Sequence, residues 1–149
     1  MIVGASQVDI TPAPGSELSG FAARTQPATG VLDPLFARAL YLADGPERLL
    51  WLHADLIGLE RSLVDAFRQW AGARHGLVPA QVMLSATHTH SGPPTIHLQE
   101  AGTYDASYVA WLSTKLQQVA TAALARPEEC QVVRAEGHCD LAIDRRRRS

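Results

Sequence analysis

Apolar positions along the chain gather in five short stretches, which we interpret as β-strands. The second and third are joined by a turn at Asp44-Gly45-Pro46, and the last alternates between apolar and polar residues. The stretch Leu49–Leu52 is continuously apolar, which predicts a strand that is buried on both faces. The five predicted strands cover Ile2–Ile10, Leu35–Asp44, Arg48–Gly58, Gln81–Ala86 and Cys130–Glu136.

Two longer segments have the helical spacing of apolar residues. Glu60–His75 ends before Gly76, a residue that favours the end of a helix. Asp105–Ala125 begins at an aspartate that can cap its first turn, and Trp111 lies on its apolar stripe. Because helices follow strands along the chain, we expect an α/β layered domain with a mixed β-sheet flanked by helices.

Two further features concern the loops. The segment 12–34 is rich in Pro, Gly, Ser and Thr and predicts a long irregular loop. Such loops in a compact domain are often functional. The second feature is the motif SATHTHSGPP, residues 85–94, which follows the predicted strand Gln81–Ala86 directly.

The two histidines of this motif are therefore placed at the edge where the strand ends. Ligands bind at this edge in α/β sheets. If the extended conformation continues, His88 and His90 point to the same side, because side chains alternate along a strand. Two imidazoles on one side can bind a metal, or divide the roles of metal ligand and acid/base. They can equally be hydrogen-bonded loop residues.

A catalytic zinc site needs three protein ligands, so the motif alone is insufficient. His53, with Asp55 two residues on, His97 and His138 are the other residues that can be considered. Each of them is interpreted first as an ordinary surface or core histidine. The two cysteines lack the close spacing of a zinc or redox motif.

Composition narrows the possible partners. The 149 residues carry a net charge of −2, which gives no overall basic field for nucleic acid or an anionic membrane. The one basic run, Arg145–Arg148, is typical of a solvated terminus or an interaction tail. No stretch is long and apolar enough to span a membrane, and the first residues do not resemble a signal peptide. We therefore expect a cytoplasmic protein of one domain.

The order of several segments resembles the N-terminal part of the catalytic domain of the neutral/alkaline, non-lysosomal ceramidases. QVMLSATHTHSGPP resembles the histidine motif of that family, and VGASQVDITP its opening strand. LSGFA, TGVLDPLFARALYL, LLWLHADLIG and AEGHCDLAIDRR follow in the family's order. The resemblance implies a zinc-dependent amidase that hydrolyses ceramide, or a related lipid or small-molecule N-acyl amide, to an amine and a carboxylate.

The same resemblance implies roles for three residues. His88 matches the family's first zinc ligand, and His90 matches a histidine placed beside the substrate. Arg145 matches an arginine that follows a short I-N-R segment, although Asp144 replaces the asparagine here. The family's other zinc ligands, a histidine, a glutamate and a tyrosine, lie downstream of the matching segment.

The resemblance therefore implies that residues 1–149 are an incomplete catalytic domain that is inactive without a C-terminal segment. Two alternatives stay open at this point. The chain is a non-catalytic α/β binding module, or it is a metal hydrolase that acts on another amide or ester.

Overall fold

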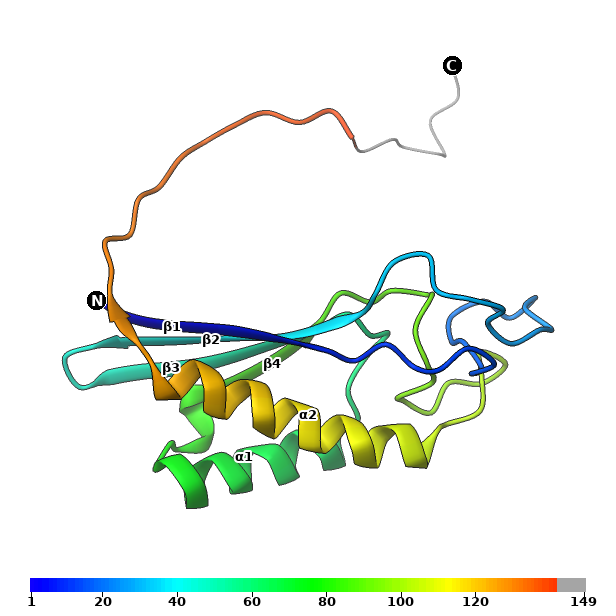
Figure 1. Cartoon of the computed structure of the whole chain (residues 1–149), viewed down its shortest axis with the longest axis horizontal. Coiled ribbons are helices and arrows are strands. Elements are labelled where there is room, and N and C mark those ends of the chain that lie inside the picture. The colour runs from blue at the N-terminus through cyan, green and yellow to red at the C-terminus, as the bar shows by residue number, and fades with distance from the viewer. Residues whose placement is uncertain (142–149) are drawn as a thin grey trace.

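The computed structural model describes residues 1–141, in which one β-sheet carries two helices on a single face (Figure 1). Arg145 lies outside the described residues. The strands are β1 (Ile2–Asp9), β2 (Phe36–Asp44), β3 (Glu47–Ala54), β4 (Val82–Ala86) and β5 (Glu128–Glu129). The helices are α1 (Arg61–His75), a short 3₁₀ turn (Pro79–Gln81) and α2 (Ala106–Ala125).

The sheet is mixed, as the sequence predicts. Its strand order is β4-β3-β2-β1-β5, with β3 and β4 parallel and all other neighbours antiparallel. The parallel pair is possible because α1 carries the chain back between β3 and β4. The α/β class predicted from the sequence is confirmed.

The core lies between the sheet and the two helices. Small and branched apolar side chains of β2 and β3 point toward the helices, and Leu112 and Leu116 of α2 meet them fully buried. At one end of α2, the Tyr108 hydroxyl donates a hydrogen bond of 2.5 Å to the carbonyl of Ile10. Burial raises the pKa of Tyr108, so this hydroxyl keeps its proton and remains a donor.

Helix α1 ends, and helix α2 begins, at the residues that the sequence predicts. Gly76 follows α1 with a φ of 66°, the left-handed conformation that glycine adopts without strain. The Asp105 carboxylate accepts a hydrogen bond of 2.9 Å from the backbone N–H of Tyr108, which caps α2. Trp111, predicted to lie on the buried stripe of α2, is instead 39% exposed.

The second face of the sheet is not covered by either helix. Trp51 and Met83 on this open face are 37% and 40% exposed. The prediction that Leu49–Leu52 is buried on both faces is therefore wrong for the described part of the chain. A continuous apolar run cannot tell whether one layer or two cover a strand, because that depends on distant segments.

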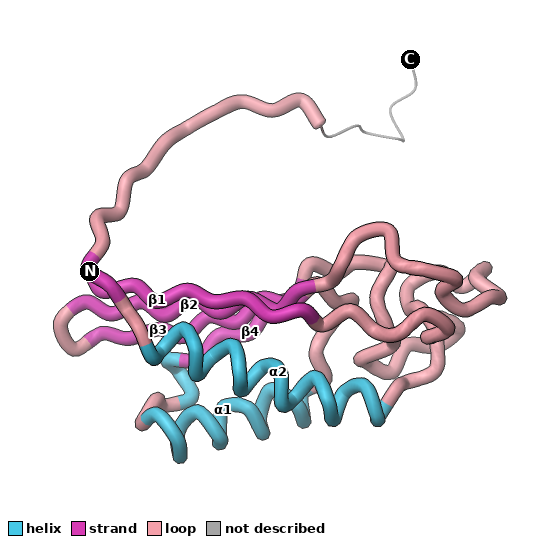
Figure 2. Tube along the Cα trace, in the orientation of Figure 1, coloured by secondary structure: helices cyan, strands magenta, loops and turns pink. Residues whose placement is uncertain are grey.

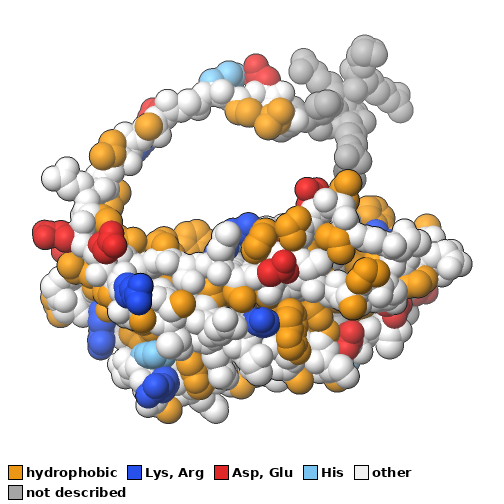
Figure 3. Space-filling model, in the orientation of Figure 1, with side chains coloured by type: hydrophobic (Ala, Val, Ile, Leu, Met, Phe, Trp, Pro, Cys, Tyr) orange, Lys and Arg blue, Asp and Glu red, His pale blue; other side chains and the backbone are white. Residues whose placement is uncertain are grey.

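The predicted strand at Cys130–Glu136 is also wrong. Strand β5 is confined to Glu128–Glu129, which pair with Val3 and Ile2 of β1. Beyond a backbone hydrogen bond from Cys130 to the Met1 carbonyl, the antiparallel register runs past the first residue of β1. The segment 130–141 has no strand beside it there and arches away from the body, and all of its residues are exposed (Figures 2 and 3).

Most loops gather at one end of the sheet, beyond the last residues of β1, β3 and β4 and away from the β2–β3 turn (Figure 2). The long irregular segment predicted at 12–34 is one of them. No helix in the part of the chain that the structure describes is long and apolar enough to cross a membrane.

Candidate functional site

The histidine motif begins where β4 ends and stays attached to the chain that leaves β3. The backbone N–H of Thr87 donates to the carbonyl of Ala54, and that of His88 to the carbonyl of Leu56, both at 3.0 Å. These bonds hold the first two residues of the loop after β4 against the segment that leaves β3. The structure thus places both histidines at the strand-end edge, where the sequence predicts them.

His88 is held in a defined orientation by the backbone of the neighbouring segment. Its ring Nδ1 lies 2.7 Å from the carbonyl oxygen of Ile57. Because a carbonyl only accepts hydrogen bonds, Nδ1 carries the proton, and in the neutral ring the lone pair is on Nε2. Metal-binding histidines have this arrangement, in which the second ring nitrogen is oriented by a carbonyl.

The backbone at His88 explains how the motif turns. Its φ of 61° is in the left-handed region, which costs a residue with a side chain about 1 kcal/mol. The extended conformation therefore ends at His88, and the predicted alternation along a strand does not continue. The two imidazoles still come together through the loop, with ring centroids 5.1 Å apart and an edge-to-face angle of 71°.

His90 is half-buried, whereas His88 is exposed. A second aromatic ring, that of Phe21, meets His90 edge-to-face with centroids 5.4 Å apart. Phe21 belongs to the irregular segment 12–34, so this loop contacts the motif. The sequence gives no signal for which of its residues makes the contact.

A hollow of about 450 Å³ lies beside the motif. Its walls come from the segment 11–35 on one side and from Thr89 and Ser91 of the motif on the other. These two hydroxyl residues flank His90 in the sequence. A molecule in this hollow would therefore lie next to the loop that carries the imidazoles.

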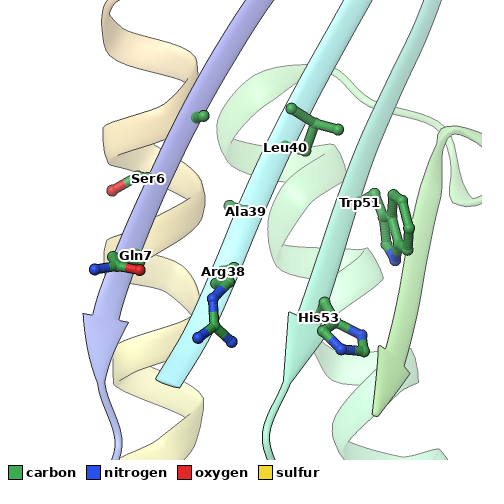
Figure 4. A pocket seen from close by; sticks show the side chains of 8 residues that line it. Ser6, Gln7, Arg38, Ala39, Leu40, Trp51 and His53 are labelled. Carbon is green, nitrogen blue, oxygen red and sulfur yellow. The ribbon is translucent and has the colours of Figure 1, made fainter. Parts of the chain in front are cut away.

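A row of polar side chains crosses the open face of the sheet near the same edge. The register places Gln7 of β1 opposite Arg38 of β2, Arg38 opposite His53 of β3, and His53 opposite Ser85 of β4. Gln7, Arg38 and His53 line a shallow hollow of about 570 Å³ on this face (Figure 4). The side chains toward the β2–β3 turn, such as Leu40 and Trp51, are apolar.

Arg38, His53 and Ser85 of this row are hydrogen-bonded to neighbouring residues. His53 Nδ1 lies 2.8 Å from the Ser85 hydroxyl oxygen, which also accepts a 2.8 Å hydrogen bond from Trp51 Nε1. Arg38 forms a salt bridge of 2.9 Å with Asp55. His53 and Asp55, considered together from the sequence, therefore have different partners.

The remaining histidines that the sequence brought into consideration are also separate from the motif. His97 stacks on Tyr104 with ring centroids 4.3 Å apart, and His138 pairs with Asp140 on the exposed segment after β5. Within residues 1–141, no group of three His, Cys, Asp or Glu side chains is arranged to hold a metal ion. Both cysteines are free and exposed.

The chain belongs to the neutral/alkaline, non-lysosomal ceramidase family. Residues 1–135 match the model of the N-terminal part of that family. The match includes the histidine motif and excludes Arg145. This confirms the family that the order of the sequence segments indicates.

Solved structures show the same fold. The chain superposes on neutral ceramidase from Pseudomonas aeruginosa with a TM-score of 0.72 and 22% sequence identity, over 85% of this chain and 22% of that one. A second structure, a ceramidase complexed with C2, matches with a TM-score of 0.69 and 22% identity, over 85% of this chain and 21% of the other. The chain thus spans about a fifth of the length of either protein.

Proposed function

We propose that this chain forms one side of the catalytic site of a zinc-dependent amide hydrolase of the ceramidase type. The proposed substrate is ceramide or a related N-acyl amide, which is cleaved to an amine and a carboxylate. The observation that carries the proposal is the pair of imidazoles at the strand-end edge. His88 has its Nε2 available and its Nδ1 fixed on Ile57, while His90 lies beside it.

Among the described residues, His88 is suited to be one of the several ligands that a zinc ion needs. His88 Nε2 is a suitable donor because the Nδ1 proton is held by a carbonyl, which fixes the tautomer. A catalytic zinc takes three protein ligands, and the described residues offer no cluster of three. We therefore propose that the other ligands come from outside the described residues, from a further segment or a partner.

His90 and Arg145 are proposed to act on the substrate. When zinc is bound, it makes hydroxide available at neutral pH, because it lowers the pKa of a water ligand to about 7. His90 would donate a hydrogen bond to the developing oxyanion and move a proton to the leaving amine. Arg145 would add a fixed positive charge there.

The proposal can be tested with the 149-residue chain and with a longer protein. The chain alone, with added zinc, should hydrolyse a short-chain ceramide negligibly, because a single histidine holds zinc weakly. The longer protein joins this chain to the remaining part of a ceramidase-type catalytic domain. It should show chelator-sensitive hydrolysis, measured by release of the amine.

Variants of the longer protein distinguish the proposed roles of His88 and His90. His88→Ala should remove both retained zinc, measured by elemental analysis, and turnover. His90→Ala should keep the zinc and lower kcat by about 10²–10⁴-fold, the range of a general acid or base. His75→Gln, at the far end of α1, is the control that should change neither. Full zinc retention by His88→Ala would contradict the ligand assignment, and chelator-sensitive turnover by the short chain would contradict the incomplete site.

A further inference from the structure

Gly20 in the long loop lies against His90, where only a glycine fits. Its φ is 103°, a conformation that side chains disfavour. A Cβ atom built on Gly20 would lie 2.5 Å from Cγ and 2.7 Å from Cβ of His90. The loop backbone therefore forms a wall that limits how the His90 side chain can move.

Two side chains that follow Gly20 extend this wall around the imidazole. The Phe21 ring meets the His90 ring edge-to-face, as described above. The guanidinium carbon of Arg24 lies 5.0 Å from the centroid of the Phe21 ring, within the range of a cation–π contact. The Phe21 ring thus contacts both the His90 imidazole and the Arg24 guanidinium.

Arg24 also binds the backbone of the histidine motif directly. Its Nη1 donates a hydrogen bond of 3.1 Å to the carbonyl oxygen of His90 and a longer one of 3.4 Å to that of Ser19. A charged donor makes a stronger hydrogen bond than a neutral one. One half-buried guanidinium therefore joins the long loop to the residue whose side chain is proposed to act.

The loop is itself anchored to the rest of the site. Ser19 is fully buried, its N–H donates to the carbonyl of Gly92 at 2.8 Å, and its hydroxyl donates to the carbonyl of Ala101 at 2.7 Å. The segment Ser19–Arg24 is therefore tied through Ser19 to Gly92 and Ala101, which both follow His90 in the chain. It has a fixed base from which Gly20, Phe21 and Arg24 reach the imidazole.

We infer that Gly20, Phe21 and Arg24 form a clamp that sets the position of the His90 imidazole, with Arg24 as a positioning residue. The catalytic consequence of the clamp rests on the proposed function, whereas its geometry does not. His88 is fixed differently, through Ile57, and lies outside the clamp. Loosening the clamp should therefore move His90 and leave the hydrogen bond between His88 and Ile57 in place.

The geometry can be tested on the 149-residue chain without metal or substrate. NMR of the histidine ring protons reports each imidazole, and nuclear Overhauser effects report the contact between the rings of Phe21 and His90. Arg24→Gln removes the charge, and we expect it to weaken that Overhauser effect and shift the His90 resonances. The His88 resonances should shift far less, and Arg24→Lys should restore part of the contact. Arg61→Gln, an exposed arginine of α1 with a 91% exposed side chain, is the matched control.

Gly20→Ala tests the clamp independently of Arg24, because the added Cβ must displace His90. If this variant does not fold, Arg24→Gln and Phe21→Leu still decide the question. Unchanged His90 resonances and an unchanged ring contact in folded Arg24→Gln would overturn the inference. So would equal shifts at His88 and His90, since these indicate a general loosening of the loops.

A kinetic measurement on the longer protein tests the consequence. Arg24→Gln should lower kcat by about 10–100-fold, the loss expected when a catalytic group is misplaced by an ångström. Zinc content and KM should stay close to those of the parent, and Arg24→Lys should recover part of the rate. An unchanged kcat with a displaced His90 would count against the role of His90 in the proposed function and leave the clamp itself intact.

Discussion

The two faces of the sheet differ in what covers them and in what they are made of. The face under α1 and α2 consists of small and branched apolar side chains, and Ala37, Leu50 and Leu52 there are at most 1% exposed. The open face carries larger side chains, and Leu40 and Trp51 line its hollow (Figure 4). The difference shows that the face under α1 and α2 holds the hydrophobic core of the described chain. The residues of the open face do not belong to that core.

The open face is also divided along the strands. Its polar row lies at the edge from which the histidine motif leaves β4, and its apolar side chains lie toward the β2–β3 turn. On the covered face, the strand residues that meet the helices, such as Ala39, Leu50 and Leu52, are apolar because packing against the helices buries them. Polar side chains on the open face thus lie close to the candidate site without taking part in the core.

The largest expected effect is a difference between the two faces in how much a substitution lowers the free energy of unfolding. Leu112→Ala removes a fully buried side chain between α2 and the sheet, and we expect a loss of about 2–5 kcal/mol in the free energy of unfolding. Met83→Ala, on the open face, should cost less than about 1 kcal/mol, because the side chain is already 40% exposed. Urea unfolding followed by circular dichroism measures both. A cost for Met83→Ala that equals the cost for Leu112→Ala would mean that the open face is covered in solution.

A smaller effect tests how tightly the helices approach the covered face. Gly4 of β1 lies against the backbone carbonyl of Ala123 in α2, and an added Cβ would collide with that oxygen. Because backbone cannot move aside cheaply, we expect Gly4→Ala to cost about 1–3 kcal/mol of stability. Gly30→Ala is the matched control, since a Cβ there meets nothing within 4 Å. It should be neutral or stabilising by up to about 1 kcal/mol. Equal stabilities of the two variants would contradict the close approach of α2.

The secondary structure of the covered face could be predicted because its signals are local. The apolar spacing of α1, the glycine after it and the aspartate before α2 all act within a few residues. The strands β1 to β4 agree with the predicted stretches to within one or two residues at most ends, and within four where β3 ends. The failures at Cys130–Glu136 and on the open face arise where the outcome depends on whether a distant segment lies alongside.

The candidate site was predictable only in part for the same reason. The motif and its place after β4 are visible in the sequence, and the resemblance supplies the proposed roles of His88 and His90. The contacts that orient the imidazoles join residues 31 and 66 positions apart, from His88 to Ile57 and from Arg24 to His90. No spacing rule connects such residues. The left-handed conformation of His88 is equally absent from the local pattern, because only a small minority of non-glycine residues adopt it, although histidine is enriched among them.

The smallest expected effect is a dependence of stability on pH that arises from His75, at the end of α1. The ring of His75, the last residue of α1, packs edge-to-face on Trp70 with centroids 5.1 Å apart. Its Nε2 is buried and has no hydrogen-bond partner among the described residues. Burial, and secondarily the charge of Arg74, lowers the pKa of His75 below its ordinary value of 6.5.

A lowered pKa means that the unfolded chain binds a proton at His75 more readily than the folded chain does. The folded state should therefore be more stable above pH 6.5 and lose a little stability as the pH falls from there toward the lower folded pKa. The measurement is the urea midpoint at about pH 7.5 and pH 5.5, values on either side of the reference pKa of about 6.5. His75→Phe keeps a ring against Trp70 and removes the titration, so its midpoint should fall less than that of the parent. An identical fall in both proteins would show that the folded environment does not disfavour the protonated ring.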